Sequence, residues 1–255
     1  MKRSAELDKA LEAATAAAEI ARGYYRSNLS VTIKEDRTPV TKADVECERA
    51  IREILLGAFP DYGFYGEETG KTRTDAGESW LVDPIDGTKA FVRRYPFFST
   101  QIALLRDGEL VLGVSCASMF GETAWAERDK GAWLNDERVH VSDIADLEAA
   151  AVSAGNLRSM AADGAWSRYG EVVAEADRIR GYGDFYHYHL LAAGKIDAVI
   201  ESDVNILDIA ALAVIVEEAG GVFTDLQGAR PGLGTTSVLA ANPRLHAALL
   251  DRFTS

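Results

Sequence analysis

Carboxylates are the side chains of this sequence best suited to chemistry, and their densest pattern lies in WLVDPIDGTKAF, residues 80–91. Asp83 and Asp86 stand on either side of Pro84, so both can face one point at the end of a strand. Gly87 allows a close backbone approach, and free N–H groups at the start of a helix can bind a phosphate. The structural alternative, an Asp-Pro turn followed by an aspartate that caps a helix, stays open.

Two further acids follow or interrupt apolar segments. Glu67, in GEETG, comes after a short predicted strand, and an acidic surface loop is its structural alternative. Asp208 lies in the apolar run ILDIAALAVIV at the predicted start of a helix, where the helix dipole would stabilise it as an N-cap or first-turn residue. A carboxylate that is buried among such apolar neighbours must otherwise be paired or bound to metal.

These acids indicate a metal site if they converge on one point of the fold. Several carboxylates at one point repel one another and partly protonate, whereas a divalent cation offsets the repulsion. Hard oxygen ligands suit Mg²⁺, and adjacent metal ions can orient a water, clamp a phosphate and stabilise a leaving oxygen. The pattern therefore favours metal-dependent hydrolysis of a phosphate ester.

The overall composition excludes several other classes of protein. The chain has 255 residues, of which 47% are hydrophobic and 26% charged, as in a globular protein and unlike a disordered chain or a coiled coil. Forty acidic and 27 basic residues give a net charge of −13, which disfavours nucleic acid and anionic membranes as partners. Cys47 and Cys116 are too few for a disulfide framework or a four-cysteine zinc site. Because neither a signal peptide nor a membrane span is apparent, we expect a cytoplasmic protein.

Hydrophobic periodicity and turn residues predict helices and strands along the whole chain. The predicted helices cover residues 5–25, 42–58, 165–174, 185–193, 206–219 and 243–251. The predicted strands cover residues 62–65, 80–83, 99–106, 110–117, 122–128, 150–154, 198–201, 222–225 and 236–241. This order predicts layers of helix and mixed sheet, with a soft boundary near residues 140–150.

The chain resembles the inositol-monophosphatase-like, Mg²⁺-dependent phosphatases along nearly its whole length. The resemblance rests on TPVTKADVECE, then GEE, then DPIDGT, and then DIAA before EAGG, in this order. It implies a layered α/β fold, the αβαβα sandwich with mixed sheets of inositol monophosphatases and fructose bisphosphatases, and a homodimer. Residues 1–145 would form an N-terminal α+β subdomain with most metal ligands, and residues 146–255 a C-terminal α/β subdomain with the specificity residues and the last metal ligand.

Residue by residue, the resemblance implies a site for two or three Mg²⁺ ions. Glu67, Asp83 and the carbonyl group of Ile85 would hold the first ion. Asp83, Asp86 and Asp208 would hold the second ion. Glu67 would also help to hold a third ion through water, which makes it a catalytic residue as well as a ligand.

The same resemblance assigns the remaining parts of the reaction. Asp86, Gly87 and Thr88 would contact the substrate, with the phosphate on the backbone N–H groups of Gly87 and Thr88. Thr88 and Asp44 would form the catalytic pair that polarises the attacking water. One departure is Leu207, which stands where the family commonly has Trp, and which would change packing behind the metal rather than ligation.

Substrate choice is expected in the second half of the chain. Asp184, in GYGDFYHYHLLAAG, and Lys89, directly after DGT, resemble the histidinol-phosphatase branch of the family, and Glu201 matches a position that contacts substrate hydroxyl or amine groups. Histidinol phosphate carries an ammonium and an imidazole group, so Asp184 and Glu201 could pair with it, whereas neutral inositol offers only hydroxyl groups. The structural alternative for Asp184 is the N-cap of the helix that follows it.

Other polar residues near these motifs have simpler interpretations. His187 and His189 would point roughly 200° apart on a helix, so they cannot chelate one ion together, and we expect them at the surface or in packing contacts. Arg93 and Arg94 could bind the substrate phosphate, but a salt-bridged loop or a dimer contact is their alternative. Asn156 and Arg158 are further candidates for a substrate loop.

The combined expectation is a cytoplasmic, Mg²⁺-dependent and lithium-sensitive phosphomonoesterase that acts on histidinol phosphate in histidine biosynthesis. The nearest alternative is an inositol-1-phosphate phosphatase, and other members of the family cleave fructose bisphosphate or the 3′-phosphate of adenosine bisphosphate. An alternative of another class is a catalytically weak member that interacts with RNA polymerase or the ribosome. The expected partner is a small-molecule phosphate ester, with no nucleic acid and no membrane.

Overall fold

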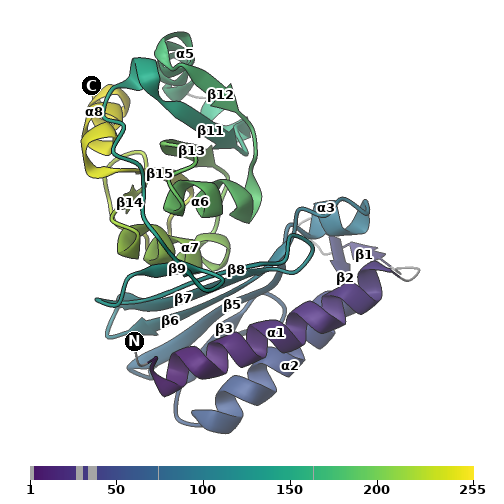
Figure 1. Cartoon of the computed structure of the whole chain (residues 1–255). Coiled ribbons are helices and arrows are strands. Elements are labelled where there is room, and N and C mark those ends of the chain that lie inside the picture. Colours follow the sequence, from purple (N-terminus) through teal and green to yellow (C-terminus); the bar gives the residue numbers. More distant parts are fainter. Residues whose placement is uncertain (1–2, 27–30, 34–38, 74, 163) are drawn as a thin grey trace.

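The helices α1 (Ala5–Tyr25) and α2 (Lys42–Ala58) lie side by side and form one outer layer of the molecule (Figure 1). The computed structural model describes residues 3–26, 31–33, 39–73, 75–162 and 164–255. The Ser4 side chain accepts a hydrogen bond from the backbone N–H of Leu7 and so caps α1. The buried face of α1 is largely alanine, which lets the helix lie close to its neighbours. Both helices have the predicted bounds, because each has a clear 3.6-residue pattern of buried residues.

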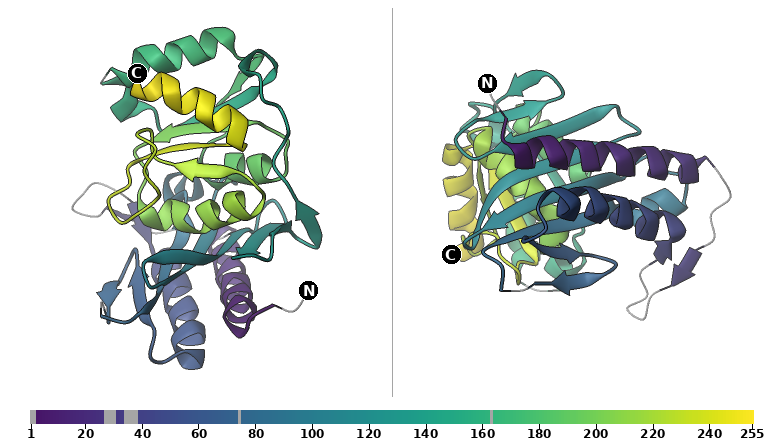
Figure 2. Two further views of the ribbon diagram at one scale, coloured as in Figure 1. Left: turned by 90° about the vertical axis from the view of Figure 1, so that its left-hand side faces the viewer. Right: turned by 90° about the horizontal axis from the view of Figure 1, so that it is seen from below.

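The first sheet has eight strands and covers α1 and α2 (Figures 1 and 2). In chain order they are β3 (Gly63–Gly66), β4 (Gly70–Thr72), β5 (Glu78–Asp86), β6 (Ser99–Arg106), β7 (Glu109–Ala117), β8 (Glu122–Glu127), β9 (Ala132–Leu134) and β10 (Glu137–Val139). Their order in the sheet is β10-β9-β8-β7-β6-β5-β3-β4. Strands β3 and β5 are parallel and the other pairs are antiparallel, so the sheet is mixed, as predicted.

The second sheet has five strands in the order β12-β11-β13-β15-β14. In chain order they are β11 (Ala151–Gly155), β12 (Arg178–Arg180), β13 (Ala198–Ser202), β14 (Val222–Thr224) and β15 (Ser237–Ala241). Strand β11 runs parallel to both of its neighbours, whereas β15 runs antiparallel to β13 and β14. A separate antiparallel ribbon joins β1 (Val31–Ile33) and β2 (Pro39–Thr41).

Two helices lie between the sheets and two cover the outer face of the second sheet, which completes the predicted αβαβα layers (Figures 1 and 2). The inner pair is α6 (Asp184–Ala192) and α7 (Ile206–Glu218), and the outer pair is α5 (Ala165–Glu175) and α8 (Pro243–Thr254). The short helices α3 (Thr88–Val92) and α4 (Arg158–Ala161) and the 3₁₀ turn η1 (Leu147–Ala149) lie in connections. Helix α7 is buried along most of its circumference because sheets flank it on both sides.

Helix α7 packs closely on strand β7 because Gly113 has no side chain there. A Cβ atom at Gly113 would lie well inside van der Waals contact with the Ala211 carbonyl oxygen. Leu207 is 4% exposed and packs in the core between the sheets. The position of α7 therefore depends on a glycine in a strand that is distant in sequence.

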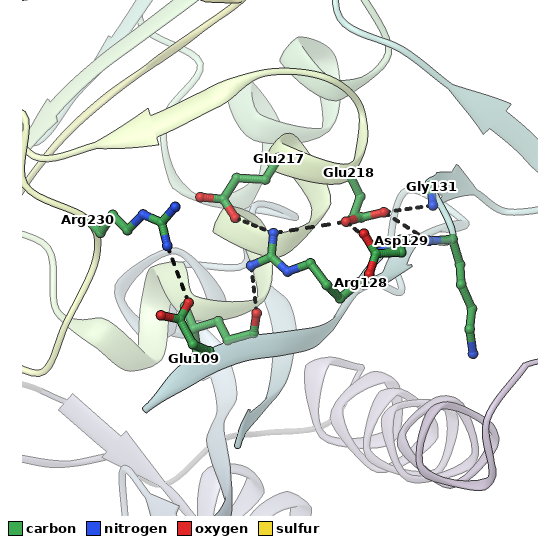
Figure 3. Close-up of polar contacts among 9 residues, drawn as sticks. Glu109, Arg128, Asp129, Gly131, Glu217, Glu218 and Arg230 are labelled. Carbon is green, nitrogen blue, oxygen red and sulfur yellow. Dashed lines mark hydrogen bonds and ion pairs between the residues drawn. The ribbon is translucent and has the colours of Figure 1, made fainter. Parts of the chain in front are cut away.

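The C-terminal end of α7 is tied to the first sheet by the polar contacts that Figure 3 shows. Glu218 accepts hydrogen bonds from three successive backbone N–H groups in the turn after β8, those of Asp129, Lys130 and Gly131. Arg128 forms an ion pair with Glu217 at 2.9 Å and donates to the Leu110 carbonyl oxygen at 2.8 Å. A second pair, Arg230 with Glu109, lies nearby at 3.4 Å. The contacts of Glu217 and Glu218 position α7 against strands β7 and β8.

Strand β5 differs from its prediction at the residues of most interest. The predicted strand ends at Asp83, but β5 continues through Pro84 to Asp86. Asp83 pairs with Gln101 and Asp86 pairs with Ser99, so the register shifts between the two acids and the strand is irregular there. Proline lacks a backbone N–H, which fits an irregular position of the ladder.

Several short strands were not predicted, namely β1, β2, β4, β9, β10 and β12, each of three residues. The predicted division at residues 145 and 146 falls in the connection between the two sheets, and separate subdomains stay a prediction. Both cysteines are buried free thiols. Within the part of the chain that the structure describes, no helix has the length and apolar character of a membrane span.

Candidate active site

A cleft of about 760 Å³ opens where β5, the short helix α3 and the first turn of α7 meet. Its lining residues come from both halves of the chain and are Glu67, Asp83, Ile85, Asp86, Gly87, Thr88, Lys89, Ala90, Arg93, Tyr95, Asn156, Leu157, Arg158, Asp184, Asp203 and Asp208. The cleft thus contains six carboxylates against three cationic side chains. Nearly all the predicted site residues line it, with Asp44 and Glu201 lying behind its wall.

Asp83, Asp86 and Asp208 converge in this cleft. One carboxylate oxygen from each lies within 4.8 Å of those of the other two, a spacing at which all three can bind one metal ion. Asp83 and Asp86 reach this point from the irregular end of β5, where the register shift lets two residues of one strand face the same way. Asp208 reaches it from the first turn of α7.

The electrostatics of the three acids fit a cation. Burial and the charges of Glu67, Asp86 and Asp208 raise the pKa of Asp83 well above its usual range. Burial and the charges of Asp184, Asp208 and Glu201 do the same to the pKa of Asp86. Burial raises the pKa of Asp208 to about 6, although a hydrogen bond from Asn205 lowers it. A divalent cation would offset this desolvation and repulsion, so the donor set suits a hard metal ion.

Asp208 combines two roles that the sequence left as alternatives. Its Oδ2 accepts from the backbone N–H of Asn205 at 3.0 Å, and the Asn205 side chain caps the helix in return. Asn205 is therefore the N-cap, and Asp208 is a first-turn residue rather than the cap itself. The same carboxylate also belongs to the group with Asp83 and Asp86 that could hold a metal ion.

The other helix-cap alternative is wrong for Asp86. Helix α3 begins at Thr88 with Gly87 as its N-cap, and Asp86 belongs to strand β5. Gly87 has a φ of 87°, and a Cβ atom there would lie 2.5 Å from the Phe97 carbonyl oxygen, so only glycine fits this turn without strain. The turn leaves the start of α3 open to the cleft.

Thr88 and Asp44 meet beside the acidic cluster. The Thr88 hydroxyl lies 3.3 Å from Asp44 Oδ1 and 3.0 Å from the Ile85 carbonyl oxygen, so its proton can be donated to either acceptor. The other oxygen of Asp44 accepts from the Thr41 backbone N–H and hydroxyl group at 2.8 and 2.6 Å. Burial raises the pKa of Asp44, while its bonds from Thr41 lower it.

Glu67 follows β3 directly, and its backbone N–H donates to the Val82 carbonyl oxygen of β5 at 3.2 Å. Strands β3 and β5 are parallel, so their carboxyl ends meet at the same edge of the sheet. Glu67 therefore lines the same cleft as Asp83. The loop that contains Glu67 therefore forms part of the wall of the cleft. The alternative interpretation, an acidic surface loop apart from the site, does not hold.

Asp184 and Glu201 come from α6 and β13 and differ in depth. Asp184 begins α6 and lines the cleft, and burial together with the charge of Glu201 raises its pKa to about 6. Its alternative as the helix N-cap is wrong, because Gly183 holds that position. Glu201 is 2% exposed and accepts hydrogen bonds from Tyr188 at 2.7 Å and Asn156 at 3.3 Å.

His187 and His189 are both buried, so the surface interpretation is wrong and the packing interpretation holds. His187 Nε2 lies 3.1 Å from Glu201 Oε2. His189 lies 3.1 Å from Glu122 on strand β8. The two rings contact different carboxylates, in agreement with their expected divergence along the helix.

Ser99 and Gln101 are additional residues of the site that the sequence analysis did not identify. The Ser99 hydroxyl donates to Asp86 Oδ2 at 3.3 Å, and the Gln101 side chain donates to the Ser99 oxygen at 2.8 Å. They alternate along β6 and so share one face of the sheet. The strand pattern alone carried no signal for this contact, because it depends on the pairing of β6 with the irregular end of β5.

Comparison with known proteins agrees with this geometry. The sequence model of the inositol monophosphatase family matches residues 3–254. A histidinol-phosphatase of Mycobacterium tuberculosis is 38% identical over 256 residues, which cover 98% of this chain and 98% of that protein. An inositol-1-monophosphatase of Rhizobium meliloti is 35% identical over 98% of this chain and 97% of that protein. The crystal structure of the extragenic suppressor protein suhB from Bartonella henselae matches with a TM-score of 0.91 and 32% identity, and covers 99% of each chain.

The layered fold, the acidic cleft and these relatives define a phosphoric monoester hydrolase. The chain belongs to the inositol monophosphatase family, which confirms the resemblance carried by its motifs. Members of this family depend on metal ions, in keeping with the group formed by Asp83, Asp86 and Asp208.

Proposed function

We propose that the protein is a Mg²⁺-dependent phosphomonoesterase that converts L-histidinol phosphate to L-histidinol and phosphate. The observation that carries this proposal is the position of Asp184, an anionic side chain in the same cleft as the metal-binding acids. Relatives named histidinol-phosphatase, at 35–38% identity, support the same substrate. A place in histidine biosynthesis and in the cytoplasm follows from this assignment.

The acids of the cleft divide into two overlapping ligand sets under this proposal. Glu67, Asp83 and the Ile85 carbonyl group would hold one Mg²⁺ ion. Asp83, Asp86 and Asp208 would hold a second, and Glu67 would contribute to a third through water. Bound Mg²⁺ supplies Lewis-acid chemistry, since it polarises the phosphate oxygens and offsets the negative charge that develops in hydrolysis.

Thr88 and Asp44 position the water that attacks phosphorus. When Thr88 donates its proton to Asp44, the lone pairs of the hydroxyl oxygen are free to accept a proton from water. The raised pKa of Asp44 makes its carboxylate a better acceptor for the proton that Thr88 passes on. The backbone N–H groups of Gly87 and Thr88 would receive the phosphate oxygens at the open start of α3. The P–O ester bond then breaks as the water–phosphorus bond forms, one proton of the attacking water stays on the phosphate product, and the proton that passed through Thr88 to Asp44 is returned through solvent to the leaving alkoxide.

Substrate selectivity rests on the side of the cleft where Asp184 lies. An ionised Asp184 would pair with the ammonium group of histidinol phosphate, a charge-assisted contact that a neutral sugar alcohol cannot make. Glu201 lies beneath and would add negative potential there, even though its oxygens already accept from Tyr188 and Asn156. Direct contact between Glu201 and substrate stays a prediction.

A second candidate substrate is inositol 1-phosphate, because the Rhizobium meliloti relative of 35% identity is named an inositol-1-monophosphatase. The test is a comparison of kcat/KM for histidinol phosphate, inositol 1-phosphate, fructose bisphosphate and adenosine 3′,5′-bisphosphate, each with Mg²⁺ and with a chelator. We expect histidinol phosphate to be preferred by at least about tenfold, which corresponds to about 1.4 kcal/mol of transition-state binding. Preference for another ester would overturn the substrate, and absence of turnover on all four would favour an interaction protein.

The assembly and the inhibitor sensitivity belong to the same proposal. We expect a homodimer, which light scattering on the purified protein would measure directly. We also expect Li⁺ to inhibit turnover in the presence of Mg²⁺. A monomer would contradict the first expectation, and turnover that Li⁺ leaves unchanged would contradict the second. Neither result would change the assignment of the site residues.

A further inference from the structure

A carboxylate outside the predicted site holds the loop that carries Glu67. Glu48 lies on α2 and is 0% exposed. Its Oε2 accepts from the backbone N–H of Glu68 at 2.7 Å, and its Oε1 accepts from that of Thr69 at 2.9 Å. Both oxygens of one buried side chain are thus used on two successive amides directly after Glu67. Such bonds to a charged acceptor are stronger than bonds between neutral groups.

Gly66, the residue before Glu67, leaves room for the Glu48 carboxylate because it has no side chain. Gly66 ends β3, and a Cβ atom there would lie 2.5 Å from Cδ and Oε2 of the Glu48 carboxylate. A side chain at position 66 would therefore displace either the loop or Glu48. This glycine has an ordinary backbone conformation, so the absence of a side chain is explained by the carboxylate rather than by the turn.

Glu48 also lies on the same face of α2 as Asp44, one turn away. Asp44 contacts Thr88 at 3.3 Å, and one turn further along α2 Arg52 contacts Thr69 at 3.3 Å. One face of α2 therefore reaches both the residues after β5 and the loop after β3. Helix α2 in turn packs on α1 and on β5, which makes it a firm support for both segments.

We propose that Glu48 is a positioning residue that fixes the Glu67 carboxylate for metal binding by holding the Gly66–Thr69 loop. This inference rests on the proposed role of Glu67 as a metal ligand. Glu48 itself does not line the cleft, so it acts through the loop and not on the metal or substrate. Groups that orient a metal ligand from behind commonly change metal affinity or activity about 10–100-fold when they are replaced.

The test compares Glu48→Gln with Glu53→Gln, the same substitution at an exposed position on the same helix. In the metal-free protein, hydrogen exchange should speed up at the amide of Glu68 or of Thr69, because the NH2 group that replaces one carboxylate oxygen cannot accept from the N–H that faces it. In calorimetry the Mg²⁺ dissociation constant should rise about tenfold or more. In kinetics the Mg²⁺ concentration for half-maximal rate should rise likewise, and Glu53→Gln should change none of these.

Gly66→Ala keeps the proposal testable if Glu48→Gln folds poorly, and a double-mutant cycle tests the contact between the two positions. Gly66→Ala alone should weaken Mg²⁺ binding, because the new methyl group collides with the Glu48 carboxylate. In a Glu48→Ala background that methyl group has room, so the same glycine change should have a clearly smaller effect. Additive effects would show that the two positions act independently and would overturn the inference.

The variant Glu67→Gln separates this inference from the proposed function. If Glu67→Gln leaves Mg²⁺ binding unchanged, the ligand role that the proposed function gives to Glu67 is wrong, and the positioning role of Glu48 loses its basis, whereas the substrate comparison still decides the activity. If Glu67→Gln weakens binding but Glu48→Gln changes neither Mg²⁺ affinity nor amide exchange, only the positioning role of Glu48 is overturned.

Discussion

The Thr88 hydroxyl lies 3.3 Å from Asp44 Oδ1, although 44 residues separate the two in sequence. Asp44 stands in the first turn of α2, and Thr88 begins α3 directly after β5. The second oxygen of Asp44 is engaged by Thr41, so Oδ1 is the oxygen that remains for Thr88. The capping box that starts α2 therefore also orients a carboxylate toward the cleft.

Removal of the Thr88 hydroxyl tests this pair. Thr88→Val keeps the shape of the side chain but has no oxygen to accept a proton from water, so kcat should fall about 10²–10⁴-fold. Thr88→Ser keeps the hydroxyl and is the matched control, with most of the activity retained. Steady-state kinetics with saturating Mg²⁺ makes the comparison, and equal activity of the two variants would exclude a role for the hydroxyl.

Asp86→Asn removes one member of the acidic cluster. We expect kcat to fall by at least about three orders of magnitude, equivalent to about 4 kcal/mol of transition-state stabilisation. The metal-free variant should be no less stable to heat than the parent, because a buried repulsive charge is lost. Asp61→Asn, at a side chain that is 99% exposed, is the control and should change neither quantity. A nearly normal rate in Asp86→Asn would contradict the assignment of Asp86 to the active site.

The affinity for Mg²⁺ should increase as pH rises from about 5 to about 7. Burial raises the pKa of Asp208 to about 6 and the pKa of Asp83 and Asp86 well above their usual range, so protons compete with the metal below neutral pH. Calorimetric titrations at several pH values measure this dependence directly. A constant affinity over this range would contradict the raised pKa values.

The same shifts predict how the metal-free protein responds to pH. A carboxyl group whose pKa is higher in the folded than in the unfolded state binds protons preferentially in the folded state. The contribution of Asp208 and Asp184 to stability is therefore present at about pH 4 and is lost as pH rises through 6. Thermal unfolding with a chelator present should show this loss, and Mg²⁺ should reverse it at neutral pH.

Asp184→Asn tests the proposed substrate. Loss of a charge-assisted contact should raise KM for histidinol phosphate about 10–100-fold, while KM for inositol 1-phosphate should change much less. Asp203→Asn is the matched control, because it removes one negative charge from the same cleft. The test is to measure kcat and KM for both substrates with the parent protein, Asp184→Asn and Asp203→Asn. Equal losses on the two substrates would remove the reason to prefer histidinol phosphate.

Gly113→Ala should destabilise the protein, because the added methyl group would collide with the backbone of α7 at Ala211. We expect a loss of about 1–3 kcal/mol in the free energy of unfolding, together with weaker Mg²⁺ binding as α7 and Asp208 shift. Gly57→Ala is the control, since a Cβ atom there meets no neighbour within 4 Å and alanine favours the helix. Denaturant unfolding measures both variants, and unchanged stability of Gly113→Ala would contradict the close packing.

The long elements could be predicted because their periodic patterns are contained in neighbouring residues. Helix α1 keeps its predicted bounds, with alanines at helical spacing on its buried face. The three-residue strands β9, β10 and β12 were missed because three residues cannot establish an alternation. The end of β5 was missed for another reason: Asp83-Pro84-Ile85-Asp86 reads locally as a turn, and only pairing with β6 keeps it in the sheet.

The candidate site, too, has features that the sequence predicts and features that it does not. The order of the motifs indicated which acids belong together, and Asp83, Asp86 and Asp208 do converge. The partners that hold the site in shape could not be predicted, among them Ser99 behind Asp86 and Glu48 behind the Glu67 loop. Their residue types are ordinary, and nothing in their local sequence marks them for these contacts.

By itself, the sequence determined the family, the layered fold and the identity of the acids, because motifs and periodicity reside in adjacent residues. Only the tertiary structure decided that a shifted register in β5, a glycine under α7 and the start of α2 bring those acids to one cleft. The physical reason is that burial and mutual repulsion of carboxylates depend on distances between segments far apart in the chain. Those distances are set by packing, which no local pattern records.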